Sequence, residues 1–266
     1  SGISMKSSVC IEMIYLEYPL LQRIEKAAAA GFDAIEFWNW DNKDLPAIKA
    51  AVQKAGIGIA TFQANLGGTL IDPDQRIAFV AGVQQSLDKA REMGVRALFL
   101  LTDELGPDRG VAHQFPDLPE TTKRQSVLDG LKALSPLAEK AGVTLYVEPL
   151  NTLVDHKGYW LNRSSAGLEL VREVNSPNIR LLYDIYHLQV MEGNLIRTLI
   201  DNLDAIGHIH VADVPGRHEP GTGEINFSRV FAALREAGYT GFVGMEFEPT
   251  IPSEKAAAGA LALARG

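Results

Sequence analysis

The run GHIHVADVPGRHEP, residues 207–220, decides how this chain is expected to fold. It opens as an alternating strand, and because successive strand side chains point to opposite faces, His208 and His210 share one face. A turn at 213–216 and a charged loop at 217–219 follow. One histidine in a strand is more often a hydrogen-bonded core residue, but three other strands of this chain also end in carboxylates. Together these strand ends favour a functional site over packing alone.

Composition and charge disfavour several classes of function. The 266 residues are 46% hydrophobic, which is enough for a large core. The formal net charge is −8, and an acidic protein repels phosphate backbones and anionic lipids, so we expect no nucleic-acid partner and no membrane surface. No apolar run reaches the roughly 18 residues of a membrane span. Cys10 is the only cysteine, which excludes an internal disulfide and a thiolate metal cluster and predicts a reducing, cytoplasmic location.

The first residues are expected to lie outside the fold. Residues 1–4 precede Met5 and resemble the remnant of an expression tag. The stretch 1–8 has no apolar segment, so it lacks the pattern of a signal peptide. We therefore expect a single domain that spans residues 5–266.

Strand-like runs and helical segments alternate along the whole chain. The helix at 120–141 is expected to end at Gly142, and Ile185-Tyr186-His187 is expected to connect a strand to a helix at 195–203. Such alternation predicts an α/β fold with a parallel sheet, and eight units in about 250 residues predict a single (β/α)8 TIM barrel. A doubly wound open sheet is the alternative, but no G-x-G-x-x-G follows the first strand. The expected strands are 9–14, 34–37, 58–62, 97–101, 143–147, 179–183, 207–211 and 242–245.

Four ionisable side chains stand at the carboxyl ends of consecutive predicted strands: Glu148, Asp184, His210 and Glu246. In a barrel these ends converge on one rim. Three carboxylates around a common point repel one another unless a cation joins them, and oxygen-rich ligation with one histidine suits Mg²⁺ or Mn²⁺. The sequence therefore predicts a divalent-metal site at the mouth of the barrel. The alternative is that each acid is a solvated strand end with no shared centre.

Two further residues are candidates for substrate contacts. The guanidinium of Arg217 matches a carboxylate or phosphate in a bidentate way, and His187 lies three residues beyond Asp184. We expect a structural, hydrogen-bonded role for His208, and for Glu36 either a place at the rim or a packing salt bridge. Aromatic residues in the predicted rim loops either wall a pocket or pack the loops, and they favour a homo-oligomer: Trp38, Trp40, Tyr159 and Trp160.

Several segments of the chain resemble the hydroxypyruvate isomerase family, which belongs with ketose 3-epimerases to the xylose-isomerase-like TIM barrels. The resemblance covers nearly the whole chain, and VPGRHEPGTGEIN is its most specific part. It implies that Glu148, Asp184, His210 and Glu246 are metal ligands, that Glu148 and Glu246 are also the catalytic pair, and that His187 and Arg217 bind substrate. The segments are VEPLN at 147–151, YDIYHLQ at 183–189, GHIHVADVPGRHEPGTGEINF at 207–227 and GMEFEP at 244–249.

The resemblance also implies an activity. We expect a metal-dependent isomerase that interconverts a small α-hydroxy aldehyde and ketone by enediolate proton transfer, with hydroxypyruvate and tartronate semialdehyde as the pair. A ketose 3-epimerase or a 2-oxo-tetronate isomerase would use the same site. Members of the family often have Gln where this chain has His210, and epimerase relatives have His, so the two activities stay open. A non-catalytic sugar-binding protein is the alternative from another class, and it would have no need of two opposed glutamates.

Overall fold

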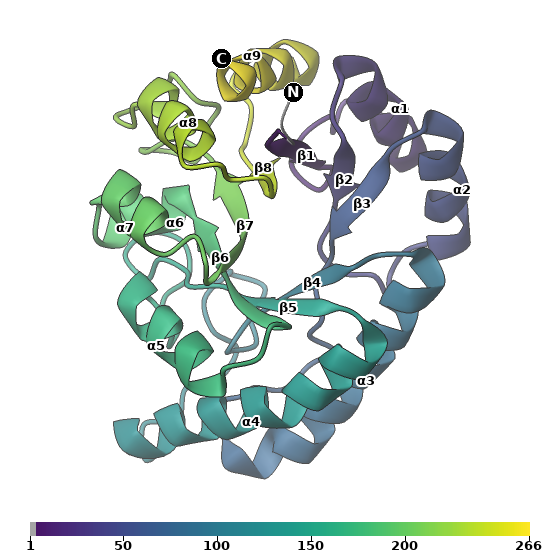
Figure 1. The fold of residues 1–266 in the computed structure, drawn as a ribbon. Coiled ribbons are helices and arrows are strands. Elements are labelled where there is room, and N and C mark those ends of the chain that lie inside the picture. The colour runs from purple at the N-terminus through teal and green to yellow at the C-terminus, as the bar shows by residue number, and fades with distance from the viewer. Residues whose placement is uncertain (1–3) are drawn as a thin grey trace.

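Eight parallel strands form a nearly closed barrel in this computed structural model, which describes residues 4–266 (Figure 1). The strand order is β3-β2-β1-β8-β7-β6-β5-β4. The two edges meet through the backbone of Phe99, whose N–H donates to Phe62 O at 3.0 Å while its carbonyl accepts from Ala64 N at 2.8 Å. The strands are β1 Lys6–Cys10, β2 Ala34–Glu36, β3 Gly58–Thr61, β4 Ala97–Leu100, β5 Thr144–Val147, β6 Ile179–Asp184, β7 Ile206–Val211 and β8 Phe242–Met245.

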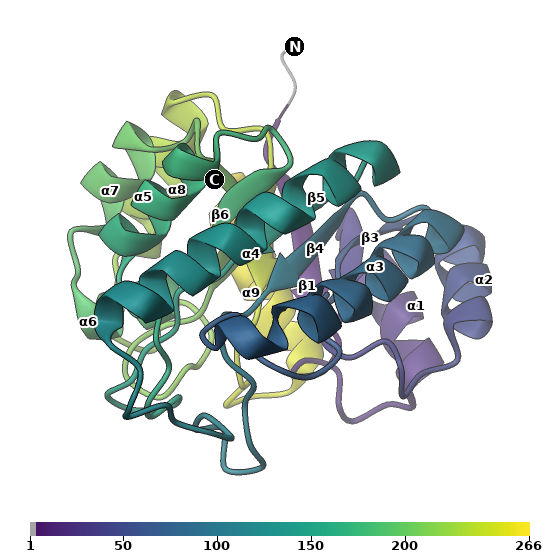
Figure 2. The same cartoon turned by 90° about the horizontal axis from the view of Figure 1, so that it is seen from below.

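Helices surround the barrel, and α3 and α4 cross one flank side by side (Figure 2). The predicted (β/α)8 architecture is confirmed over the described residues, whereas residues 1–3 of the predicted tag remnant lie outside them. No helix within residues 4–266 is both long and apolar enough to cross a bilayer. The helices are α1 Leu20–Ala30, α2 Leu45–Ala55, η1 Pro73–Gln75 (3₁₀), α3 Arg76–Met93, α4 Glu120–Ala141, α5 Ser164–Val174, α6 Ile185–Met191, α7 Leu195–Asp201, α8 Phe227–Glu236 and α9 Ser253–Arg265.

Local sequence signals set some of these boundaries well and others poorly. Helix α4 has the predicted bounds, and Gly142 ends it in a left-handed conformation with φ of 67°. The prediction of the first strand at 9–14 is wrong at both ends, because β1 is Lys6–Cys10 and the N–H groups of Met13 and Ile14 donate back to Cys10 O. The connector predicted at 185–187 is instead the first turn of α6. Both errors concern apolar, buried segments in which strand and turn look alike.

Candidate active site

The structure brings the four predicted metal-ligating residues together at the carboxyl ends of adjacent strands. Glu148 directly follows β5, Asp184 is the last residue of β6, His210 lies on β7 and Glu246 directly follows β8. One potential ligand atom from each lies within 4.8 Å of those of the others, and all four side chains are buried. Because β8, β7, β6 and β5 are consecutive in the sheet, neighbouring strand ends bring side chains 98 residues apart in the chain to one point.

The donor atoms of the cluster suit a cation. Three buried carboxylates face Nδ1 of His210, a nitrogen that can coordinate a metal ion. His210 Nδ1 lies 3.6 Å from Glu148 Oε2, 3.7 Å from Asp184 Oδ2 and 3.3 Å from Glu246 Oε2. Within the described chain this buried nitrogen has no hydrogen-bond partner of acceptable geometry. Three oxygen donors and one imidazole nitrogen form a donor set suited to Mg²⁺ or Mn²⁺.

Burial and charge shift the protonation of these groups in different directions. Burial raises the pKa of Glu148 to about 8, with Glu246 and Asp184 adding to the effect and His210 opposing it. Burial also acts to raise the pKa of Asp184, but His187, His210 and Arg217 hold that pKa well below its usual value. For His210, burial alone would lower the pKa, yet the surrounding carboxylates raise it well above the ordinary value. The cluster therefore holds protons where a bound cation would replace them.

Glu36, which the sequence left undecided, lies beneath the cluster as an acceptor for both histidines of β7. Its carboxylate accepts from His208 Nε2 at 2.9 Å, from Ser8 Oγ at 2.7 Å and from His210 Nε2. Burial would raise the pKa of Glu36, but His210 and His208 hold the pKa well below its usual value, so the group is a carboxylate. His208 has the structural role expected of it, and its ring also stacks on Tyr146 with a centroid separation of 5.8 Å.

Arg217 lies between the carboxylate cluster and the open pocket. Its Nη2 donates to Glu246 Oε1 at 2.5 Å, and its guanidinium lies over the ring of Tyr186 at 5.3 Å. Its backbone is left-handed, with φ of 62°, a conformation that costs free energy in a non-glycine residue and is common at functional sites. Both contacts orient the guanidinium, which lines the pocket.

One buried carboxylate holds the loop that carries Arg217. Asp213 Oδ1 accepts from the N–H groups of Val214 (2.9 Å) and Ile225 (3.1 Å), and Oδ2 accepts from those of Gly221 (2.9 Å) and Gly223 (3.0 Å). A side chain at Gly223 has no room, because a Cβ there would lie 2.0 Å from Val214 O. These contacts explain why an aspartate stands at position 213 and a glycine at position 223.

His187 presents an N–H group to the site because Asn151 fixes its ring. Asn151 Oδ1 accepts from the backbone N–H groups of Val154 and Asp155, both at 3.0 Å, so the amide NH₂ must face the other way. That NH₂ donates to His187 Nδ1 at 2.7 Å, which leaves the ring proton on Nε2, 3.6 Å from Asp184 Oδ2. Burial lowers the pKa of His187 to about 3, so the ring is neutral near pH 7 and Nε2 is a donor.

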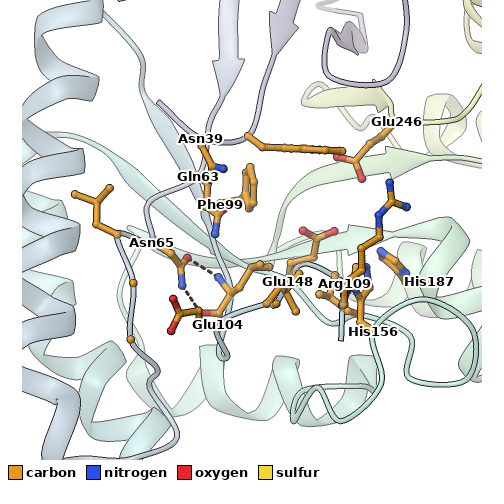
Figure 3. Close-up of a pocket in the computed structure, with 18 of the residues that line it drawn as sticks. Asn39, Gln63, Asn65, Phe99, Glu104, Arg109, Glu148, His156, His187 and Glu246 are labelled. Carbon is orange, nitrogen blue, oxygen red and sulfur yellow. Dashed lines mark hydrogen bonds between the residues drawn. The ribbon is translucent and has the colours of Figure 1, made fainter. Parts of the chain in front are cut away.

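A pocket of about 570 Å³ opens above the cluster (Figure 3). Figure 3 shows Glu148, His187 and Glu246 at one end, and Asn65 and Glu104 at the other. His156 lines it too, although its place in a long loop gave no reason to single it out.

The four aromatic residues of the predicted rim loops have different roles. Trp38 lines the pocket, and Trp40 donates to Ser86 Oγ. Tyr159 donates to Glu148 O at 2.8 Å, and Trp160 Nε1 donates to Glu120 Oε2 at 3.0 Å.

Sequence analysis missed the role of Asn151, and for Glu36 it offered a salt bridge as one of two alternatives without identifying the partners. Asn151 stands inside the VEPLN segment, three residues after Glu148, so its position in that motif was a usable signal. Glu36 is the last residue of β2, and the acids of the cluster likewise stand at strand ends. Its histidine partners lie on β7, and nothing in the sequence indicates that β2 and β7 are in contact.

A parallel (β/α)8 barrel with an acid–imidazole cluster at its mouth defines the class of protein, and comparison with known proteins gives the family. Residues 24–265 match the model of the family described as "Xylose isomerase-like TIM barrel". The chain is 31% identical to a 2-oxo-tetronate isomerase of Cupriavidus necator, with 90% of this chain and 91% of the relative covered. It is 30% identical to the hydroxypyruvate isomerase of Escherichia coli, with 94% and 96% covered.

A solved structure shows the same fold. The crystal structure of an AP endonuclease, family 2, from Brucella melitensis matches with a TM-score of 0.86 at 27% identity, covering 97% of this chain and 99% of that one. The chain belongs to the xylose isomerase-like TIM barrel family. Since the curated relatives that share almost all of its length are isomerases, the prediction of an isomerase-type enzyme is confirmed.

Proposed function

We propose that this protein is a divalent-metal-dependent isomerase that interconverts a small α-hydroxy aldehyde and ketone, with hydroxypyruvate and tartronate semialdehyde as the substrate pair. The observation that carries the proposal is the meeting of Glu148, Asp184, His210 and Glu246 within 4.8 Å at the base of a pocket. The curated relatives named hydroxypyruvate isomerase and 2-oxo-tetronate isomerase support the same chemistry.

The two glutamates of the cluster are the proposed proton carriers. The hydrogen next to a carbonyl is too weakly acidic for an unaided carboxylate to remove, and Mg²⁺ or Mn²⁺, when bound, would supply the positive charge that stabilises the enediolate oxygens. Glu148 and Glu246 reach the same point from different strands, so one can take the proton from one carbon and the other can return a proton to its neighbour. Return of the proton to the opposite face of the same carbon would give an epimer instead.

His187 and Arg217 are the proposed substrate-binding residues. The neutral Nε2–H group of His187 can donate to a hydroxyl or carbonyl oxygen without competing for the catalytic proton. Arg217 donates through Nη2 to Glu246 and also lines the pocket, so other N–H groups at the end of its guanidinium can bind the carboxylate of an oxo-acid. The net charge of −8 disfavours a nucleic-acid substrate.

Solvent deuterium tests the proposed role of the glutamates. The Mn²⁺-loaded protein should exchange the transferred hydrogen of hydroxypyruvate with deuterium and form tartronate semialdehyde. Glu148→Gln and Glu246→Gln should each lower turnover by roughly 10²-fold or more, because a positioned acid or base contributes about that much. Glu236→Gln, an exposed change on α8, is the matched control. A Gln variant that turns over at the wild-type rate would remove its residue from the mechanism.

A substrate panel separates the proposal from its nearest alternatives. Turnover of four-carbon 2-oxo-tetronate in preference to hydroxypyruvate would keep the chemistry and change the substrate. Turnover of neutral ketoses without any oxo-acid would favour a 3-epimerase, and it would leave Arg217 without the carboxylate assigned to it. The variant Arg217→Leu should raise the KM for an oxo-acid far more than the KM for a neutral ketose.

A further inference from the structure

Glu36 reaches across the interior of the barrel to a residue that is not its neighbour in the sheet. It is the last residue of β2, and its carboxylate accepts from the imidazole of His210 on β7. The strand order places β1 and β8 between β2 and β7. The contact is therefore made by side chains inside the barrel.

A glycine on β8 leaves the space for this contact. Gly244 pairs in register with His210 on one side and with Ser8 on the other. A Cβ at position 244 would lie 2.5 Å from Glu36 Oε2 and 3.0 Å from His208 Nε2. Three strands thus contribute to one arrangement: a carboxylate from β2, a missing side chain on β8 and two imidazoles from β7.

The contact determines which nitrogen of His210 can bind a cation. A neutral imidazole has one N–H and one lone pair. Ser8 Oγ and His208 Nε2 both face Oε2 of the Glu36 carboxylate, and His210 Nε2 faces Oε1. In this geometry the carboxylate accepts from His210, so the proton of a neutral ring lies on Nε2 and the lone pair on Nδ1. Nδ1 is the atom that faces Glu148, Asp184 and Glu246. Metal-binding histidines commonly donate their second ring N–H to a carboxylate in this way.

We propose that Glu36 is a positioning residue that holds His210 as the Nε2–H tautomer and so aims the Nδ1 lone pair at the cation site. The proposal rests on the metal-dependent function proposed above. His208 and Ser8 in turn fix the Glu36 carboxylate, since each donates to its Oε2 and leaves Oε1 for His210.

Mn²⁺ affinity of the metal-free protein, measured by isothermal titration calorimetry, tests this role without any need for turnover. Glu36→Leu removes the acceptor and should weaken Mn²⁺ binding by about 10- to 100-fold, the loss typical of such outer partners. Glu36→Gln keeps a carbonyl oxygen that can face His210, so its loss should be smaller. Ser8→Ala removes one donor to Glu36 and leaves His210 in place, so its loss should be smaller still. Circular dichroism checks that each variant is folded.

A second background separates tautomer control from a simple loss of negative charge. A glutamine at position 210 offers an oxygen ligand that has no tautomers. In a His210→Gln protein, Glu36→Leu should therefore weaken Mn²⁺ binding little further. An equal fold-loss in both backgrounds, or wild-type affinity in folded Glu36→Leu protein, would overturn the proposal while leaving the metal site intact. Absence of Mn²⁺ binding by the wild-type protein would overturn the proposed function as well.

Discussion

At the scale of single residues, His210 and His187 differ in the ring nitrogen that they present to the site. With a cation bound, His210 would present its Nδ1 lone pair to the site, whereas His187 presents a neutral Nε2–H group. In each case a buried neighbour, Glu36 or Asn151, decides the tautomer. One ring can thus ligate a cation while the other donates to substrate.

The pKa of Glu148 predicts how the metal-free protein responds to pH. Burial raises this pKa to about 8, so between the ordinary value of 4.5 and pH 8 the folded protein holds a proton that the unfolded chain has lost. The stabilisation is complete below pH 4.5 and is lost as pH rises through 8, by up to about 1.4 kcal/mol per pH unit. Glu148→Gln has no such proton. Urea unfolding between pH 5 and 9 should show a weaker fall in stability for the variant, whereas identical profiles would contradict this assignment.

At the scale of elements, the strand ends could be predicted from the sequence and the connections between distant strands could not. Glu148, Asp184, His210 and Glu246 were found because each stands at the end of a recognisable strand. The pairing of Glu36 with His210 depends on the space over Gly244, which no local pattern reveals. Helix α6 was missed for another reason: it is short and its first four residues are all buried, so it lacks an amphipathic pattern.

The loop from 212 to 226 offers a test at this scale. Asp213→Asn places an NH₂ group against two of the four backbone N–H donors, which should cost about 1–3 kcal/mol for the unpaired groups. The KM for an oxo-acid should rise as well, because the loop carries Arg217. Chemical denaturation and hydrogen exchange at the amides of Gly221 and Gly223 measure the effect.

The matched control for that loop is Asp44→Asn. Asp44 also accepts from a backbone N–H, that of Ala47, at the start of α2. Asparagine is as good as aspartate at such a helix start, so the free energy of unfolding should change little. If both variants lost the same free energy of unfolding, Asp213 would stabilise its loop no more than an ordinary helix-capping aspartate does.

At the scale of the whole molecule, a cation at the barrel mouth would add a further connection between four strands that backbone hydrogen bonds and side-chain packing already join. The fold could be predicted from the chain length and from the alternation of strands and helices. The pattern of a strand followed by a helix is local in the sequence, and it occurs eight times. The near closure of the barrel between β3 and β4, through residues 62–64 and Phe99, was not visible in the sequence.

Linkage then predicts a global effect of the metal. At a free Mn²⁺ concentration 100 times the dissociation constant, the free energy of unfolding should rise by about 2.7 kcal/mol, and a chelator should reverse the gain. Asp184→Asn, which removes one ligand charge, should reduce it. A Tm that is the same with Mn²⁺ and with chelator would argue against binding at the mouth.

The most direct test of the account is anomalous diffraction from crystals of the protein grown with Mn²⁺. We predict one strong peak enclosed by the carboxylates of Glu148, Asp184 and Glu246, with His210 bound through Nδ1 and its Nε2 still donating to Glu36. A peak elsewhere, or none, with the four side chains left as they are would contradict the proposed metal centre.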